Sequence, residues 1–437
     1  MSERDFDDLV ITTEFETAFE VMNETTEHVF ISGNAGTGKS TLLEFFKSKT
    51  AKKMAVLAPT GVAAVNVKGQ TIHSFFGFKP SVTVGTVRKL SQEKQDLMCA
   101  LDCIVIDEIS MVRADLMDCI DHALRMNRDI DKPFGGVQVI MIGDLFQLPP
   151  VLTEEERFLF EMEYTSPFFF SAHVMQGLEL RYIELKKIFR QDDQTFIDLL
   201  NRIRNKEVTK DDITAWNERH DPYYDPTDAE GLVHLTTTNY MADKRNELEL
   251  KKLKNKEWKF KAKAQGATDS KRMPAPESLV LKEGSQVMFT SNDPTKRWVN
   301  GTLGVITAIR PKGLQKNAAD IEVKLTNGKT VTAEQFTWNT YEFAHNVKSG
   351  AVEAEVTGSY TQYPLTLAWA VTIHKAQGKT FDRIFLDMGR GAFAHGQLYV
   401  ALSRCTTLEG IVLRQPFSSR DVIIDPQVME FVKEKLA

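Results

Sequence analysis

Short apolar runs separated by polar turns are the first regular feature of this chain. Residues 28–32 (HVFIS), 103–106 (CIVI) and 137–142 (VQVIMI) have the length of strands, and glycine or acidic residues follow each run. A continuous apolar run of this length is typical of a strand that is buried on both faces in a parallel sheet. Residues 41–47 (TLLEFFK) have instead the spacing of a helix start. The pattern predicts an α/β fold.

A different pattern occupies residues 304–360. Residues 305–309 (VITAI), 321–325 (IEVKL) and 330–333 (TVTA) are rich in β-branched side chains, and residues 352–360 alternate between apolar and polar. The Asn-Gly pair in residues 326–329 (TNGK) predicts a hairpin turn. We therefore expect a small antiparallel barrel inserted into the α/β chain.

Length and composition change this picture little. The chain has 437 residues, of which 42% are hydrophobic and 26% are charged, so two or three soluble domains are expected. No apolar run reaches membrane-spanning length, and the acidic start MSERDFDD lacks the form of a secretory or mitochondrial signal. We expect a cytoplasmic protein. The cysteines form no CxxC pair, which favours free thiols over a zinc site or disulfides: Cys99, Cys103, Cys119 and Cys405.

The charge of the chain is unevenly distributed. The net charge is −6, yet residues 244–263 carry nine lysines and arginines. A local basic surface is enough to bind nucleic-acid phosphates. Two interpretations stay open for this segment, a solvated helix face and a surface that faces phosphate groups.

The segment GNAGTGKST, residues 33–41, fits the pattern GxxxxGK[ST] between a predicted strand and a predicted helix. Glycines allow the tight turn in which backbone N–H groups point at phosphate oxygens, and the helix N-terminus adds its positive dipole end. Lys39 is expected to reach the β- and γ-phosphates, and the Ser40 hydroxyl to bind Mg²⁺. The expected nucleotide contacts are Gly33, Gly36, Thr37, Gly38, Lys39, Ser40 and Thr41.

Polar residues at later strand ends complete this predicted site. Asp107 and Glu108 follow residues 103–106, where Asp107 would hold Mg²⁺ and Glu108 would polarise the attacking water. Gln147 follows the next strand and could contact the γ-phosphate, although a turn-stabilising role is equally open. Arg190 and Arg404 could neutralise the transition state, since guanidinium groups suit its spread negative charge.

Eight segments in this order resemble superfamily 1 helicases, and most closely the petite-integration-frequency (PIF) DNA helicases of the 5′→3′ class, which are related to RecD and phage Dda. The segments are GNAGTGKS, APTGVAA (58–64), TIHSFF (71–76), IVIDEISM (104–111), GDLFQLPPV (143–151), LKKIFRQ (185–191), AVTIHKAQGKTFD (370–382) and YVALSR (399–404). Residues 107–136 are also similar to the signature of that family.

The resemblance implies two RecA-like P-loop domains with ATP in the cleft between them. It implies a first domain at residues 1–185, with a wedge insertion at 76–100, and a second at 186–303 and 361–437. Residues 304–360 resemble the SH3-like barrel insertion of this class. Arg190 and Arg404 would be arginine fingers from the second domain or its edge, and Gln377 and Gly378 would join the ATP site. The adenine-reading glutamine of the family is replaced by Glu16, which predicts looser base selectivity, with a surface glutamate as the alternative.

The resemblance also implies a track for single-stranded DNA. Hydroxyl, imidazole and aromatic groups lie in the matching motifs, although Phe75 could equally be a core residue. The expected DNA contacts are Thr60, Gly61, His73, Ser74, Phe75, Thr237, Asn239, Thr372 and His374.

These features together predict an ATP- and Mg²⁺-dependent 5′→3′ DNA helicase that translocates on single-stranded DNA and unwinds duplex DNA. The expected partners are single-stranded DNA and forked or 5′-tailed duplexes, with G-quadruplex DNA as a further candidate. We expect a monomer of bacterial or phage origin that does not bind membranes. A P-loop switch that signals to a protein partner would show no DNA dependence, and an RNA-directed motor is only weakly excluded.

Overall fold

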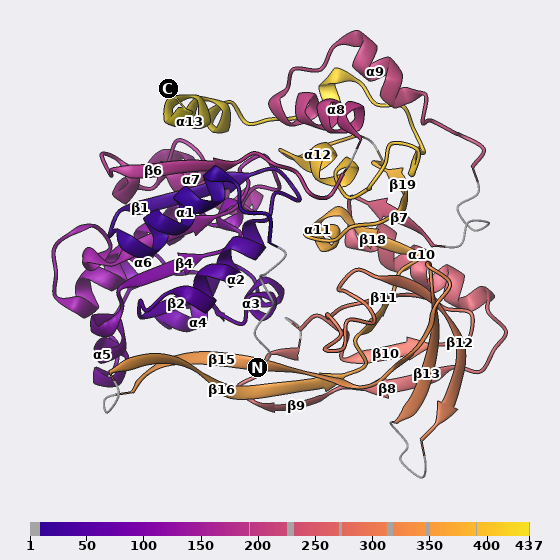
Figure 1. Cartoon of the computed structure of the whole chain (residues 1–437), viewed down its shortest axis with the longest axis horizontal. Helices are drawn as coiled ribbons and strands as arrows, with labels where there is room; N and C mark the ends of the chain where they lie inside the picture. The colour runs from indigo at the N-terminus through magenta and orange to yellow at the C-terminus, as the bar shows by residue number, and fades with distance from the viewer. Residues whose placement is uncertain are drawn as a thin grey trace. The chain divides into compact units, whose positions relative to one another are not determined.

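The computed structural model describes residues 9–191, 193–224, 231–270, 273–312, 318–346, 350–389 and 391–436. The chain forms two compact units. The first comprises Met1–Arg190, Thr340–Thr357 and Asp425–Ala437, and the second comprises Gln191–Asn339 and Gly358–Ile424. Each unit contains a parallel sheet with helices, and antiparallel strands are added to the second, so the predicted α/β class is confirmed (Figure 1). Within the described residues, no helix has the length and apolarity needed to cross a membrane.

The sheet of the first unit has six strands, all of them parallel. The three apolar runs that the sequence predicted as strands are its central members. The order across the sheet is β3 (Gln70–Thr71), β2 (Met54–Ala58), β4 (Cys103–Ile106), β5 (Gln138–Ile142), β1 (His28–Gly33) and β6 (Leu180–Leu185).

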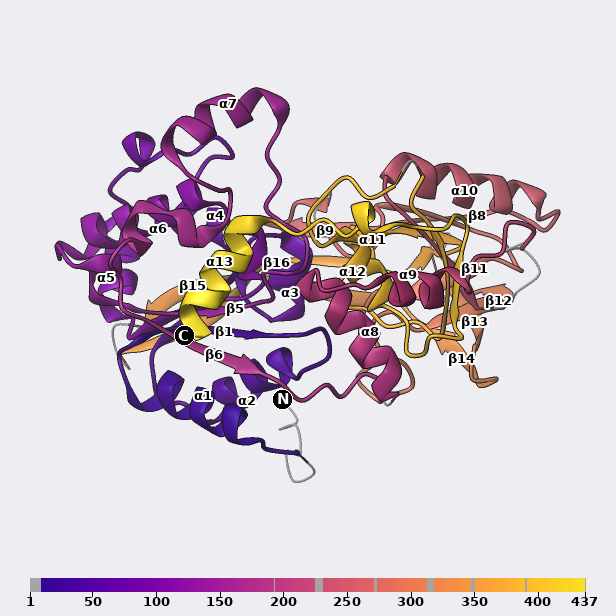
Figure 2. The ribbon, with the colours of Figure 1, turned by 90° about the horizontal axis from the view of Figure 1, so that it is seen from above.

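Both faces of this sheet are covered, which explains the continuous apolar runs. Val29 and Ile31 face a core shared with α1 (Thr13–Glu24) and α2 (Lys39–Lys49). Phe30 points to the other face, where its ring centroid lies 5.3 Å from that of Phe169. Helix α13 (Pro426–Leu436) covers this second face, and its Phe431 stacks on Phe170 at 4.4 Å (Figure 2).

This packing corrects one expectation about the domains. The C-terminal residues from Asp425 onward belong to the first unit, whereas the sequence placed them in the second. The reason is the aromatic contact of Phe431 with the first sheet, which sequence adjacency to second-unit motifs does not reveal. The remaining helices of this unit are α3 (Gly61–Asn66), α4 (Ile72–Phe76), α5 (Gln92–Ala100), α6 (Ala114–Arg128) and α7 (Glu154–Glu163).

The second unit has a four-stranded parallel sheet and an antiparallel part. The parallel order is β18 (Ala370–Thr372), β7 (Leu232–Thr236), β19 (Arg383–Asp387) and β20 (Ile411–Leu413). Its helices are α8 (Gln194–Asn205), α9 (Lys210–Asn217), α10 (Asn239–Lys252), α11 (Ile373–Ala376) and α12 (Gln397–Leu402).

The predicted antiparallel strands are present, but their sheet extends beyond residues 304–360. Its order is β14 (Thr330–Ala333), β13 (Ala319–Leu325), β12 (Leu303–Pro311), β11 (Gln286–Phe289) and β17 (Leu365–Leu367). A two-stranded sheet joins β10 (Ser278–Leu281) to β8 (Trp258–Lys261), and a three-stranded one joins β15 (Phe336–Asn346), β16 (Ala351–Gln362) and β9 (Lys263–Gly266). Partners from flanking sequence complete these sheets because a strand needs neighbours on its edges.

The end of β15 and the start of β16 lie in the first unit, which includes the segment Thr340–Thr357. The backbone N–H of Phe343 donates to Oε1 of Gln70 at 3.2 Å, and its ring lies 6.1 Å from that of Phe75. The predicted inserted domain therefore divides between the two units.

Candidate nucleotide and nucleic-acid site

The loop between β1 and α2 has the backbone form that its glycines predict. Gly36 has φ +85° and Gly38, the N-cap of α2, has φ +88°, both in the left-handed region that favours glycine. Thr37 is buried and donates its hydroxyl to the carbonyl of Asn34 at 3.0 Å, whereas Ser40 is exposed in the first turn of α2. Helix α2 thus presents its N-terminus at the carboxyl end of β1, where an anion is stabilised.

The side chain of Lys39 curls back over this loop. Its Nζ donates to the carbonyl oxygens of Gly33 at 2.7 Å and of Asn34 at 2.9 Å. These bonds hold the ammonium group within the loop that would surround a phosphate group. The contact of Lys39 with the β- and γ-phosphates stays a prediction.

The predicted acidic pair lies at the carboxyl end of β4, two strands away from β1. Burial raises the pKa of Asp107 to about 6, while the backbone N–H of Glu108 and the positive charges of Lys39 and Lys47 act in the opposite direction. Glu108 has φ +52°, which is uncommon for a residue with a side chain and often marks a functional turn.

The loop after β5 carries Gln147 and contacts the turn of the acidic pair. Gln147 is buried, and its Nε2 donates to Oδ2 of Asp144 at 3.2 Å. A Cβ on Gly143 would lie 2.9 Å from Cγ2 and 3.1 Å from the backbone N of Ile109. Only glycine permits this approach, so the Gln147 loop packs on the turn that begins at Glu108.

Arg190 is brought to the phosphate loop by the segment after β6. The N–H of Phe189 donates to the carbonyl of Gly36 at 2.9 Å, and a Cβ on Gly36 would lie 2.5 Å from Cβ of Arg190. Arg190 is the last residue of the first unit. The sequence assigned it to the second domain or its edge, and it lies at the boundary between the two units, where the N–H of the preceding Phe189 holds the segment on the phosphate loop.

The other predicted arginine, Arg404, belongs to the second unit and is only 1% exposed. Its guanidinium donates to the carbonyls of Val400 and Lys379 and to the hydroxyl of Ser403, at 2.8, 3.2 and 2.8 Å. Burial lowers the pKa of Lys379 to about 8, with the charges of Arg404 and Lys375 adding to this effect.

Gln191 is a residue of this region that the sequence analysis did not single out. Its buried amide donates to the carbonyl of Ser403 at 3.4 Å and to that of Cys405 at 3.0 Å, one on each side of Arg404. The residue after Arg190 thus fixes the backbone that carries Arg404. A polar residue directly after the arginine in the segment LKKIFRQ was the available signal.

The predicted DNA contacts gather at helix starts that follow parallel strands. Thr60 caps α3 and Thr372 caps α11, with side-chain oxygens that accept from Ala63 N–H and Lys375 N–H at 3.2 Å each. Two further threonines, Thr71 before α4 and Thr238 before α10, play the same role and were not singled out. The signal was a threonine before a helix start, a typical N-cap.

The side chains of this set differ in exposure. Exposed are Ser74, Asn239 and His374, whereas Gly61 and His73 are half-buried. Phe75 is only 3% exposed, with its ring against Phe76 and Phe343 at 4.9 and 6.1 Å. Its predicted stacking on DNA is therefore not supported in this structure, because apolar packing buries the ring. Thr237 is 8% exposed, so its neighbour Thr238 presents the accessible hydroxyl.

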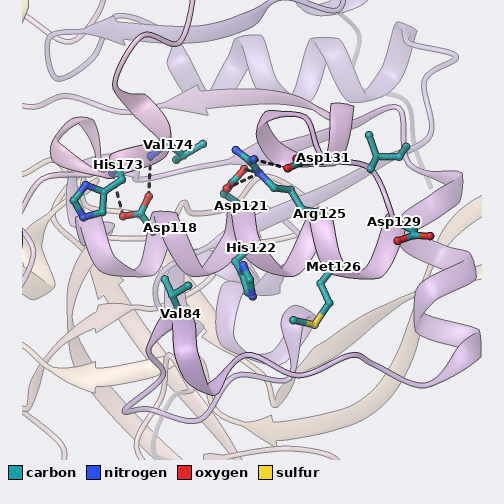
Figure 3. A pocket seen from close by; sticks show the side chains of 11 residues that line it. Val84, Asp118, Asp121, His122, Arg125, Met126, Asp129, Asp131, His173 and Val174 are labelled. Atoms are coloured by element: carbon teal, nitrogen blue, oxygen red, sulfur yellow. Dashed lines mark hydrogen bonds and ion pairs between the residues drawn. The ribbon is translucent and has the colours of Figure 1, made fainter.

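A pocket of about 730 Å³ lies along α6, within the segment that resembles the family signature (Figure 3). Asp118 accepts from the N–H groups of His173 and Val174 at 3.0 and 2.9 Å, and Asp121 pairs with Arg125 at 2.8 Å. These carboxylates tie α6 to neighbouring segments. The pocket contains none of the predicted nucleotide contacts, and its acids have a structural role.

The first unit thus contains the glycine-rich loop with the exposed hydroxyl of Ser40, the half-buried Asp107 followed by Glu108, and Arg190 beside Gly36. No group of three or more His, Cys, Asp or Glu that could hold a metal occurs among the described residues. At a nucleotide, Mg²⁺ is usually bound by a few protein oxygen atoms together with phosphate oxygens. The side chains of this region fit that arrangement.

Comparisons with known proteins agree with this chemistry. A family model described as PIF1-like helicase matches residues 11–214, and one described as UvrD-like helicase C-terminal domain matches residues 367–412. The chain is 34% identical over 419 residues to the ATP-dependent DNA helicase Pif1 of Bdellovibrio bacteriovorus, covering 93% of this chain and 88% of that protein. It is 34% identical to human ATP-dependent DNA helicase PIF1, of which it spans 61% while 93% of this chain is covered.

Solved structures give the same result. The chain is similar to Bacteroides sp Pif1 in complex with ADP-AlF4, with 37% identity, a TM-score of 0.90 and coverage of 98% and 97% of the two chains. It is also similar to Bacteroides Pif1 bound to single-stranded DNA, with 38% identity, the same coverage and a TM-score of 0.70.

Proposed function

Because this chain belongs to the Pif1-like helicase family and is an ATP-dependent DNA helicase, we propose that it translocates 5′→3′ on single-stranded DNA and unwinds duplex DNA ahead of it. The observation that carries the proposal is the contact of Arg190 with Gly36 of the phosphate loop. A loop of this kind binds a triphosphate, and the adjacent arginine makes the region competent for hydrolysis.

The roles at the nucleotide follow from the side chains. The loop 33–41 binds the phosphates of ATP through its N–H groups, and Lys39 exchanges its carbonyl partners for phosphate oxygens. Glu108 orients the attacking water, and Gln147 contacts the γ-phosphate. Ser40 and Asp107 would hold Mg²⁺, which neutralises phosphate charge when bound.

The two arginines have different tasks in this proposal. Arg190 acts at the phosphate loop, because its Cβ lies beside Gly36 and the N–H of the preceding Phe189 donates to the Gly36 carbonyl. Arg404 acts as the second arginine finger together with Gln377 and Gly378, and it must exchange present hydrogen bonds to do so. Gln191 keeps the backbone around Arg404 in place during this exchange.

Single-stranded DNA would contact the capped helix starts. The hydroxyls of Thr60 and Thr238 can each donate to a phosphate while accepting the cap bond, whereas Thr372 is only 3% exposed and would have to become accessible first. His374 and Asn239 are exposed next to these caps and can contact the backbone as well. Relatives with the same motifs have been solved with single-stranded DNA and at forked duplex DNA, which supports these partners.

The proposal also assigns the domains of a helicase of this class to the parts of the fold. The two parallel sheets are the cores of RecA-like domains, residues 76–100 form the wedge insertion, and β11 to β14 with β17 form the SH3-like barrel. Glu16 lies exposed in the first turn of α1, where a carboxylate can accept from adenine N6 but cannot donate to N7. We therefore propose that the enzyme discriminates less strictly between nucleotide bases. As separate proposals from the sequence, we expect it to be monomeric and cytoplasmic.

Unwinding of two partial duplexes tests the direction. One carries a 5′ single-stranded tail and the other a 3′ tail, and both are mixed with enzyme, ATP and Mg²⁺. Unwinding of the 5′-tailed duplex alone supports the proposal. Unwinding of the 3′-tailed duplex alone would overturn the polarity, and ATP hydrolysis without unwinding of either would leave a translocase. Lys39→Ala, which cannot bind the phosphates properly, is the inactive control.

Replacement of Arg190 separates hydrolysis from DNA binding. Arg190→Ala should lower kcat for ATP by about three orders of magnitude, the usual contribution of an arginine finger. Its affinity for single-stranded DNA, measured by fluorescence anisotropy, should stay near that of the wild type. A strong loss of DNA affinity would contradict this division of roles.

A further inference from the structure

The basic segment at residues 244–263 consists of two parts with different surroundings. Within α10, three basic side chains have carboxylate partners on the same helix, and the Lys244 ammonium lies over the ring of Tyr240. Arg245 lies 3.0 Å and Lys252 2.9 Å from Glu249, and Lys251 lies 3.8 Å from Glu247. This helical part is a solvated face whose charges balance locally.

The part after α10 is different. Residues 254–263 contain five lysines and one acidic residue, Glu257, a balance of +4 in a chain whose net charge is −6. All five lysines are exposed. We call this set the β8 lysine strip: Lys254, Lys256, Lys259, Lys261 and Lys263.

The strand β8 orients two lysines of this strip, Lys259 and Lys261, outward. Phe260 is 2% exposed and belongs to the core under the antiparallel sheet. Because side chains alternate along a strand, Lys259 and Lys261 project from the opposite face, roughly 6.6 Å apart. Glu257 lies 3.4 Å from Lys259 and offsets one positive charge, which the balance of +4 for residues 254–263 already includes.

We propose that the β8 lysine strip binds the phosphate backbone of double-stranded DNA, as a contact separate from the single-strand track. This rests on the proposed function in assuming that DNA is the substrate. Repeated ammonium groups on an exposed strand match a backbone with one charge per roughly 1.7 Å of duplex axis.

A duplex fits this strip better than a single strand does. Single-strand sites combine positive charge with aromatic rings on which bases stack. The ring of Trp258 is half-buried and has the Lys256 ammonium 4.2 Å from its centroid, and Phe260 faces the core. The strip therefore offers charge without a free stacking surface. A duplex, whose bases are already stacked inside, needs only the charge.

The start of the strip lies at the far end of α10 from Thr238, one residue of the proposed track. Helix α10 starts at Asn239, beside the capping residue Thr238, and spans 14 residues, which corresponds to roughly 21 Å. The strip begins beyond its other end (Figure 1). A phosphate bound at Thr238 and one bound at Lys254, where the strip starts, are thus separated by about the length of α10.

An alternative reading of these lysines is protection of a sheet edge. β8 pairs with β10 in a two-stranded sheet, and lysines on edge strands prevent pairing with other chains. Glutamate would protect an edge equally well, whereas it would repel DNA. Charge reversal therefore distinguishes the two roles.

The test is the double variant Lys259→Glu/Lys261→Glu of the whole chain. A second double variant, Lys210→Glu/Lys433→Glu, changes the net charge equally at exposed positions elsewhere. Fluorescence anisotropy measures binding of a blunt duplex and of a single strand of equal length over a series of salt concentrations. ATPase activity stimulated by single-stranded DNA is measured in parallel.

The strip variant should lose about tenfold in duplex affinity at low salt, and its slope of log affinity against log salt should fall by about two. Single-strand affinity and ATPase activity should be unchanged, and the control should match the wild type. Lys259→Gln/Lys261→Gln should give an intermediate loss, with an unchanged melting temperature.

Three results would overturn the proposal: unchanged duplex binding by the strip variant, an equal loss in the control, or an equal loss of duplex and single-strand binding. A different measurement tests the proposed function. If single-stranded DNA did not stimulate the ATPase activity of the wild-type chain, the helicase assignment would be contradicted. The duplex titration would still decide the role of the strip.

Discussion

Replacement of Gly36 by alanine tests how the phosphate loop positions Arg190. Gly36 has φ +85°, and an added Cβ would lie 2.5 Å from Cβ and 3.3 Å from the backbone N of Arg190. Carbon atoms are normally in contact at about 3.5–4.0 Å, so Arg190 must move by about 1 Å. The obstacle is at the base of its side chain, which a change of rotamer cannot relieve.

The expected magnitudes follow from these two effects. The left-handed conformation costs alanine about 1–2 kcal/mol, which lowers the melting temperature by roughly 3–8 °C for a unit of this size. A displacement of about 1 Å in a catalytic group costs about 100-fold in rate. We therefore expect kcat of Gly36→Ala to fall about 100-fold, more than its affinity for ATP.

The assay is steady-state ATP hydrolysis with saturating single-stranded DNA, together with binding of a fluorescent ATP analogue. Gly85→Ala is the matched control, because a Cβ at Gly85 meets nothing within 4 Å. This control should hydrolyse ATP like the wild type. A kcat of Gly36→Ala within about threefold of the wild type would refute the reasoning, since a 1 Å shift of an arginine finger has a larger effect.

Three further predictions concern the second unit. Asn246→Ala should lower the free energy of unfolding by about 2–4 kcal/mol in urea titrations. The reason is that the Asn246 amide accepts from the N–H of Ala370 at 2.9 Å and donates to its carbonyl at 2.8 Å. An Asn246→Asp variant as stable as the wild type would contradict this. Gln191→Ala should lower kcat for ATP, with single-strand affinity unchanged in anisotropy, because its amide holds the backbone around the second arginine. Burial alone would raise the pKa of Asp387, but hydrogen bonds from His234, the N–H of Gly389 and Arg414 lower it to about 2. The ionised Asp387 therefore stabilises the fold above pH ~4, and this stabilisation, on the order of 1–2 kcal/mol, is lost as the pH falls towards 2. Asp387→Asn should remove this part of the pH dependence of the melting temperature. An equal fall of the melting temperature with pH in both proteins would disprove the prediction.

Local chemistry made much of the nucleotide site predictable. A glycine-rich loop needs positive φ at defined positions, and Gly36 and Gly38 have it. A buried strand needs a continuous apolar run, so the strand before Asp107 was recognisable from residues 103–106 alone. These features depend on neighbours in the sequence.

Contacts between distant segments were not predictable in this way. Burial of Phe75 by Phe343, a residue 268 positions away, removes from the surface a ring that the motif had suggested for DNA. The aromatic contacts of Phe431 assign the C-terminal helix to the first unit. In both cases apolar area is buried by packing partners that carry no local sequence signal.

The sequence by itself determined the class of the fold, the phosphate loop and the order of the motifs, because these depend on periodicity, turn chemistry and spacing within short segments. Only the tertiary structure decided that Arg190 is anchored on Gly36 and that Gln191 holds the backbone of Arg404. It also decided that Arg245 and Lys252 lie beside Glu249 of their own helix and that Lys259 and Lys261 are exposed on β8. The physical reason is that hydrogen bonding, burial and charge balance depend on distances in space, which the order of residues along the chain does not specify.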